Sequence, residues 1–454
     1  GRCNTDFIDN SAGVDCSDNE VNIKIAFAAA RRAGRLSEER RNALLVEMTD
    51  EVAEIVLEDN RLQALALSVA ERGASHATAS HLRVIEMLEE TGDLDRRTEG
   101  LADSETLARR AAEGRGLTRP ELAVLLSSAK LRLQADIEES SLPDDEGLED
   151  LLFASFPQPM RSDFRKQIAG HRLRREIIAT QLANAVVNRL GIVHPFELAE
   201  EEGVPLSEVA AAFAVAVQLF DLDECWDSVE SAAMAEPARL LLLDYMANAV
   251  RGHMADVLRA SAGQVRPSRT LDRLDGHVAS LATDTRELLA EEARANSQKL
   301  LDRFAEAGVP TPEAERVAGL FDLDGAVGLA QLASETGIDP RMLTDAFTRL
   351  GDQMGLHWAQ STAALMAPSD PWERLLVAGL SRDFQQMRLD FLRDLSRAKK
   401  AKDDPLGAVE EWAGEREAAI RRFRAMIGRA KSAPTIAPAM LAQIASQARN
   451  MLMR

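Results

Sequence analysis

The sequence predicts a mainly α-helical protein. Alanine, leucine, glutamate and arginine, which favour helices, dominate the 454 residues, whereas aromatic residues make up only 4% and tyrosine occurs once, at Tyr245. Helix-start signals also follow one another from Ser17 onward, each a capping residue or a proline in a first turn. Composition, scarcity of strand-forming residues and recurrent start signals therefore agree on a helical core.

The first helix is expected to begin at Ser17. Ser17 and Glu20 have the spacing of a capping box. In this motif the serine hydroxyl accepts the backbone N–H three residues on, and the glutamate side chain accepts the backbone N–H of the serine. This helix should run to about Ala33, because Gly34 can adopt the left-handed conformation that stops a helix. Ser37 can cap the next helix.

Two longer helices follow. Thr49 or Asp50 can cap a helix whose apolar residues recur at helical spacing. These apolar residues are Val52, Ile55, Leu62, Ala66 and Val69. Thr118 and Glu121 repeat the capping-box spacing, with Pro120 in the first turn, where its missing N–H costs nothing.

A long helix is expected from Asp163 to Leu190, ending at Gly191. Its buried stripe should consist of Ile178, Leu182, Val186 and Leu190. Beyond it, residues 197–230 and 331–364 form a predicted internal repeat. Each copy carries a Leu-Ala pair, a glycine, a phenylalanine, a leucine and a tryptophan at nearly the same spacing. Long helices between the copies should break near Gly263 and Pro267, and Pro434 and Pro438 should interrupt the tail helices.

Net charge and hydropathy argue against two classes of partner. A net charge of -20 repels nucleic-acid phosphates and anionic membranes, and no run of about 18 apolar residues suits a membrane span. Arg161 to Arg175 is locally basic, but a salt-bridged helix face explains it better than a polyanion site. We therefore expect neither nucleic acid nor a membrane as partner.

Cysteine and histidine positions indicate neither a disulfide framework nor a metal site. The three cysteines, Cys3, Cys16 and Cys225, are odd in number and far apart, which favours a cytoplasmic protein. His76 and His81 are five residues apart, so a helix places them on different faces. No metal is expected.

The stretch most informative about function lies between Asn4 and Ser17. It is rich in short polar side chains, includes Gly13, where a backbone can approach a ligand, and leads into the expected helix start. A helix N-terminus favours a bound carboxylate or phosphate. The alternative is a polar loop that only caps the helix.

Three segments resemble the large NAD-specific glutamate dehydrogenases. They are Asn4-Thr5-Asp6 continued by Asp9 to Lys24, Leu117 to Leu126, and His171 to Thr180. The resemblance covers residues 1 to about 200 and implies the C-terminal end of a Rossmann-type dinucleotide-binding domain followed by a multi-helix C-terminal domain. It also implies oxidation of L-glutamate to 2-oxoglutarate and ammonium with NAD as cofactor.

The resemblance assigns four site residues. Asn10 matches the family's asparagine beside the nicotinamide and is the expected NAD-binding residue. Gly13, Val14 and Ser17 match the glutamate pocket, where the serine hydroxyl binds the substrate's side-chain carboxylate. Asn19 replaces a histidine common in the large enzymes, and Ala12-Gly13 replaces the Gly-Gly of smaller ones, which weakens any role for position 19 and leaves the loop less flexible.

The expected domains are 1–45, the end of the dinucleotide-binding catalytic domain; 46–195, a helical continuation; and 196–454, a helical domain for support or oligomerisation. No catalytic lysine cluster or Gly-rich fingerprint is present, so the catalytic residues are expected upstream of Gly1, in a catalytic domain of the same chain. The chain, which starts without methionine, should be an inactive fragment of a homo-oligomeric enzyme. An independent helical scaffold or regulatory binding module is the alternative.

Overall fold

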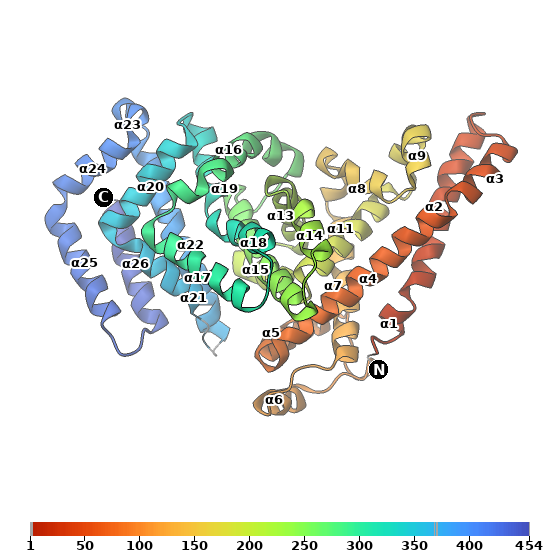
Figure 1. Cartoon of the computed structure of the whole chain (residues 1–454), viewed down its shortest axis with the longest axis horizontal. Helices are drawn as coiled ribbons and strands as arrows, with labels where there is room; N and C mark the ends of the chain where they lie inside the picture. Colours follow the sequence, from red (N-terminus) through yellow and green to blue (C-terminus); the bar gives the residue numbers. More distant parts are fainter. Residues whose placement is uncertain (1–2, 367, 369–370, 454) are drawn as a thin grey trace. The chain divides into compact units, whose positions relative to one another are not determined.

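The computed structural model describes residues 3–366, 368 and 371–453, and the side chains of 284–288 and 371 lie outside the description. Every regular element within these residues is helical, so the mainly α prediction is confirmed (Figure 1). By their internal contacts the residues form two compact units: residues 1–217 with 239–270, and residues 218–238 with 271–454. The two units are described separately below.

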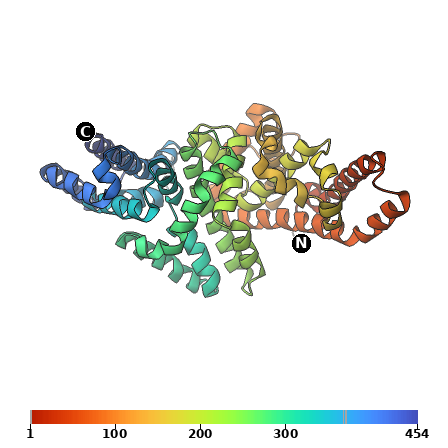
Figure 2. The same cartoon turned by 90° about the horizontal axis from the view of Figure 1, so that it is seen from above.

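The first unit begins with an antiparallel pair of helices. Helix α2 (Ser11–Arg32) leads through α3 (Glu38–Glu47) into α4 (Thr49–Gly73), which returns along α2 (Figures 1 and 2). The expected ends agree with the sequence: Gly34 has φ +68° after α2, and the Ser37 hydroxyl accepts the Arg40 N–H at 3.2 Å. Local backbone chemistry therefore sets these boundaries.

The remaining helices of the first unit complete its core. They are α1 (Asp6–Asp9), α5 (Thr78–Thr91), α6 (Ser104–Ala112), α7 (Arg119–Glu139), α8 (Glu149–Ala154), α9 (Gln158–Asp163), α10 (Arg165–Ala169), α11 (Arg174–Leu190), α12 (Val193–Glu202), most of α13 (Leu206–Leu219) and most of α15 (Glu236–Ala260). Helix α11 packs against α4, α7 and α8. Its predicted stripe of Ile178, Leu182, Val186 and Leu190 is buried.

The prediction of a single helix from residue 163 to 190 is wrong. The segment contains α10 (Arg165–Ala169) and α11 instead, with a first break at Phe164 and a second at residues 170–173, where the ring of His171 accepts the Leu173 N–H. The end at Leu190 is confirmed, since Gly191 follows with φ +74°. The capping box before α7 is also present: the Thr118 N–H donates to the Glu121 carboxylate at 2.7 Å.

The second unit contains α14 (Leu222–Ser231), most of α16 (Pro267–Leu288), α17 (Glu291–Glu306), α18 (Thr311–Asp322), α19 (Ala326–Thr336), α20 (Pro340–Met354), α21 (Leu356–Leu365), α22 (Pro371–Leu395), α23 (Lys399–Asp403), α24 (Pro405–Glu415), α25 (Glu417–Lys431) and α26 (Pro438–Leu452). Helix α22 lies against α20, α21 and α26. The fully buried Leu350, Phe384 and Leu441 belong to its core.

The predicted repeat can be followed in the order of helices. Gly203 (φ +65°) separates α12 from α13, and Gly337 (φ +72°) separates α19 from α20; a third helix follows in each case. The predicted breaks also agree, with Gly263 at φ +69° and Pro267 and Pro438 each at a helix start. The internal repeat itself stays a prediction.

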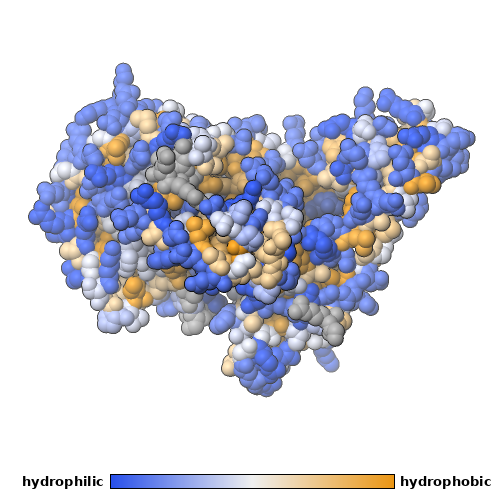
Figure 3. All heavy atoms as spheres, in the orientation of Figure 1, coloured by the Kyte–Doolittle hydropathy of each residue, from blue (hydrophilic) through white to orange (hydrophobic). Residues whose placement is uncertain are grey.

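Surface hydropathy is mixed. Hydrophilic residues cover most of the face drawn in Figure 3, and apolar residues show in smaller separate patches. Within the described residues, no helix by itself has the length and apolar character to cross a membrane; α12 and α13 pass that test only as a pair bent by 110°.

Candidate functional site

The four site residues expected from the sequence lie on one exposed face near the N-terminus. Asn10 joins α1 to α2, and Gly13, Val14 and Ser17 follow on α2 at intervals of three, four and seven residues. This spacing puts side chains on the same side of a helix. All four residues are exposed, and Val14 keeps 63% of its surface accessible. The structure thus brings the predicted site residues together.

The helix start predicted at Ser17 is wrong. Helix α2 begins six residues earlier, at Ser11, so Ser17 lies in its second turn and Gly13 is a helical glycine rather than a loop glycine. The positive end of the helix dipole acts mainly on the first turn. Ser17 therefore offers a hydroxyl group but no helix N-terminus to an anion.

Contacts from α4 explain the early start of α2. The side-chain amide of Asn60 donates to the Ile8 carbonyl at 2.7 Å and to Ser11 Oγ at 2.9 Å, and the Ser11 hydroxyl also donates to Ile8. Ile8 itself is buried. These contacts close the chain between α1 and α2 and hold the backbone on both sides of Asn10, which itself makes no capping hydrogen bond to the described residues.

Arg119 ties the preceding residues to the same framework. Its guanidinium donates to Glu71 Oε2 at 2.7 Å, to Ser68 Oγ at 3.1 Å, to the Ala64 carbonyl at 2.9 Å, and to Asn4 Oδ1. The Arg119 side chain is buried. A buried guanidinium with all of these acceptors has a structural role, because leaving its donors unpaired would cost stability.

His171 makes an equivalent link to the middle of α2. The Leu173 N–H donates to Nδ1 at 3.1 Å, so the proton is on Nε2, which donates to the Asn22 carbonyl at 3.1 Å. Burial lowers the pKa of His171 and favours this neutral form. Arg119 and His171 thus join the three family-like segments into one framework.

Two carboxyl groups and a lysine lie behind the exposed face. Asp15 on α2 and Asp59 on α4 interact electrostatically, and burial together with the charge of Asp15 raises the pKa of Asp59 to about 7. Lys130, on α7, attracts both carboxylates, but burial lowers its own pKa. This cluster was not predicted from the sequence. Asp59 falls on the apolar stripe of α4, four residues after Ile55, and a charge at such a position was the available signal.

Asn19, which also lies on α2, points away from the face. Its side chain is buried, and Nδ2 donates to both the backbone carbonyl and Oδ1 of Asp15, at 3.0 and 3.1 Å. The residue therefore supports the carboxyl cluster.

The basic stretch from Arg161 to Arg175 has internal partners. Arg161 donates to the carbonyls of Phe156 and Ala154, and Arg175 to those of Glu138 and Ser140. These contacts favour a structural role for the stretch over a polyanion site.

The described residues offer no group of three or more His, Cys, Asp or Glu side chains able to hold a metal ion. The three cysteines are free; Cys225 is buried, and burial raises its pKa to about 11.

Comparison with known proteins shows which family the chain resembles. Residues 114–450 match the family described as "Glutamate dehydrogenase, C-terminal", and residues 1–70 match "Bacterial NAD-glutamate dehydrogenase, catalytic domain". The chain belongs to the glutamate dehydrogenase C-terminal family.

Relatives named "NAD-specific glutamate dehydrogenase" support the same membership. The chain is 33% identical to that of Pseudomonas aeruginosa and 32% identical to that of Halomonas elongata, each over 94% of this chain and 26% of the relative. Identity to the Mycobacterium tuberculosis protein is 29%, over 91% of this chain and 25% of the relative. The chain thus spans about a quarter of the length of the curated relatives it matches.

Proposed function

We propose that the chain is part of an NAD-dependent glutamate dehydrogenase, which oxidises L-glutamate to 2-oxoglutarate and ammonium. One observation carries the proposal: Asn10, Gly13, Val14 and Ser17 share an exposed helix face inside the segment that matches a bacterial NAD-glutamate dehydrogenase catalytic domain. The relatives' names support the choice of substrate and cofactor. In this proposal residues 1–45 end a Rossmann-type dinucleotide-binding domain whose sheet lies elsewhere in the enzyme.

The exposed face forms one wall of the active site in this proposal. NAD, when bound, accepts the α-hydrogen of glutamate as hydride. The Asn10 amide, a donor and an acceptor, orients the nicotinamide carboxamide, and the Ser17 hydroxyl donates to the side-chain carboxylate of glutamate. Val14 supplies an apolar surface that excludes water from the substrate.

Glycine at position 13 suits this role. A Cβ built there would stand 3.6 Å from Asn10 Oδ1, so a larger side chain would extend over the amide that is to meet the cofactor. Because Ser17 has no helix N-terminus behind it, the positive charge that neutralises the substrate carboxylate must come from the rest of the enzyme.

The test uses the complete reading frame that encodes these residues. Asn10→Ala and Ser17→Ala should each lower kcat/KM for glutamate-dependent NADH formation about tenfold or more, since each removes a contact to a reacting molecule. Asn42→Ala, at an exposed position of α3, is the matched control and should leave kcat/KM unchanged. Unaltered kcat/KM in both site variants would overturn the assignment and favour a scaffold without catalysis.

We also propose that the helices of residues 196–454 support the catalytic part and carry contacts between identical subunits. Leu365 on α21 and Trp372 on α22 are 79% and 78% exposed, and Leu376, one turn after Trp372, is 41% exposed. Large apolar side chains exposed close together are typical of subunit contacts.

Light scattering tests the subunit contact. Replacing Trp372 and Leu376 together by Asp should lower the oligomer mass, because charges would enter an apolar contact. Leu57→Asp is the control, since Leu57 is 64% exposed on α4 of the other unit. An unchanged oligomer mass in the double variant would show that this surface does not carry the subunit contact.

A further inference from the structure

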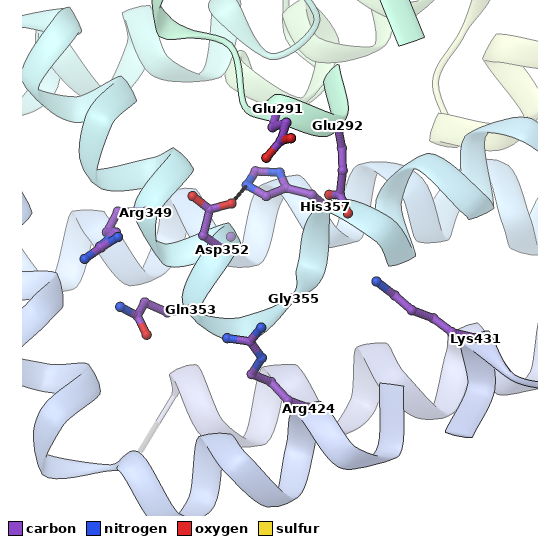
Figure 4. Close-up of a pocket in the computed structure, with 10 residues that line it drawn as sticks. Glu291, Glu292, Arg349, Asp352, Gln353, Gly355, His357, Arg424 and Lys431 are labelled. Carbon is purple, nitrogen blue, oxygen red and sulfur yellow. Dashed lines mark ion pairs between the residues drawn. The ribbon is translucent and has the colours of Figure 1, made fainter. Parts of the chain in front are cut away.

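A cavity of about 360 Å³ lies within the second unit, between α17, α20, α21 and α25 (Figure 4). Its volume falls within the roughly 300–1,000 Å³ of small-molecule sites. Its charged lining consists of Glu291, Glu292, Arg349, Asp352, Arg424 and Lys431. All residues that line it belong to the second unit, and none belongs to α2.

Two of these charged side chains have partners in the protein. Arg349 forms an ion pair with Glu410 at 2.8 Å. Asp352 Oδ1 lies 3.4 Å from His357 Nε2, which also contacts the Thr348 carbonyl at 3.1 Å. Burial and the charge of Arg388 lower the pKa of His357 to about 4, so the ring is neutral at neutral pH. These groups shape the floor of the cavity.

The other four charges stand on opposite walls. Arg424 and Lys431 reach into the cavity from α25, whereas Glu291 and Glu292 reach into it from the first turn of α17 (Figure 4). None of the four forms an ion pair with a described side chain. The walls thus offer two cations on one side and two carboxylates on the other, with the turn at Gly355 between them.

A buried guanidinium lies close behind the floor, although it does not line the cavity. Arg388 is fully buried, and its Nη1 has no hydrogen-bond partner among the described residues. A Cβ built on Gly351 would lie 2.7 Å from this nitrogen and closer still to the His357 ring, so only glycine fits at this point of the lining. The guanidinium therefore lies directly behind the floor, on which any larger residue would displace His357.

We propose that this cavity binds a small zwitterion, with its anionic group on Arg424 and Lys431 and its cationic group on Glu291 and Glu292. A ligand carrying both charges satisfies both walls, whereas a simple anion or cation leaves one pair of like charges uncompensated. Binding is a property of these 454 residues and does not depend on the proposed dehydrogenase activity.

Isothermal titration calorimetry of the 454-residue chain tests the proposal with a spacing series. The probes are glycine, 4-aminobutyrate and 6-aminohexanoate, with acetate, inorganic phosphate and butylammonium as singly functional comparisons. At least one zwitterion should bind saturably and about tenfold more tightly than any comparison. Equal binding of acetate or phosphate, or the absence of saturable binding by all three zwitterions, would overturn the proposal.

Charge-removing variants locate the bound probe. Arg424→Gln and Glu292→Gln should each weaken the tightest zwitterion about tenfold. The matched controls are Arg421→Gln on α25, whose side chain pairs with Glu417 at 2.5 Å, and Glu306→Gln at the opposite end of α17; both should bind within twofold of the parent. All four positions are exposed, and circular dichroism checks that each variant is folded. Unweakened binding in both site variants would place the ligand elsewhere and refute the site.

Discussion

The carboxyl group of Asp59 on α4 lies close enough to that of Asp15 on α2, within the first unit, for the charge of Asp15 to raise the pKa of Asp59. Asp15 Oδ2 is buried and has no hydrogen-bond partner among the described residues. Two neighbouring carboxylates that are both shielded from water repel each other when both are ionised, so a proton on Asp59 stabilises the pair. The pair therefore makes the packing of α2 on α4 sensitive to pH.

Asp59→Asn should remove most of this sensitivity. The pKa of Asp59 is raised from 3.8 to about 7 in the folded protein, so the folded state holds more protons than the unfolded state between these values, and stability falls as pH rises through this window. The free energy of unfolding of the variant should exceed that of the parent by about 1–3 kcal/mol at pH 8 and equal it near pH 4. The size follows because one pKa unit corresponds to about 1.4 kcal/mol and the two carboxyl groups share the proton. Urea unfolding across pH measures this difference. Glu54→Gln, exposed on the same helix, is the control; a constant difference between parent and Asp59→Asn would contradict the shared proton.

His81 should titrate with the opposite sign. It is buried in α5, and burial lowers its pKa from 6.5 to about 4. The unfolded state then binds the additional proton, so stability is lost as pH falls from about 6.5 to 4. Over this pH range the free energy of unfolding of His81→Gln should fall by about 2–3 kcal/mol less than that of the parent. Thermal unfolding between pH 7 and 4 measures it against His76→Gln, an exposed position. An identical acid loss in parent and variant would count against a buried neutral ring.

Arg119→Lys should destabilise the first unit by about 2 kcal/mol or more. A lysine cannot reach Glu71, Ser68, the Ala64 carbonyl and Asn4 at once, because it lacks the planar fork of donors. The control is Arg115→Lys, whose exposed side chain pairs only with Glu113 among the described residues. The free energy of urea unfolding of the two variants gives the answer; equal values would show that Arg119 contributes no more than an exposed arginine.

Asn60→Ala should loosen the junction that carries Asn10. It removes the donors to the Ile8 carbonyl and Ser11 Oγ, which should cost about 1–2 kcal/mol. Amide exchange of residues 8–13 should accelerate, while exchange within α11 should change little. Asn42→Ala serves as the control. Unchanged exchange at residues 8–13 would mean that Asn60 does not position this segment.

Local signals in the sequence predicted where helices end more accurately than they predicted the geometry of the site. Gly34, Gly191, Gly203 and Gly337 end helices as expected, because a left-handed conformation is a property of the residue itself. The start of α2 was placed too late, since Ser17 has the pattern of a capping box but the backbone there is already helical. Two equally good local signals compete in this segment, and packing against α4 decides between them.

Membership of the family was accessible from the sequence, and so was the proposal that Asn10, Gly13, Val14 and Ser17 form one site, because both rest on residue types and short spacings. Only the tertiary structure decided that the four share an exposed helical face, and that Asp15 meets Asp59 behind it. Those outcomes depend on α4 returning along α2 and bringing Asn60 to Ser11. Contacts between residues more than forty positions apart have no local signature, and so their effects on a helix start or a pKa follow only from the folded chain.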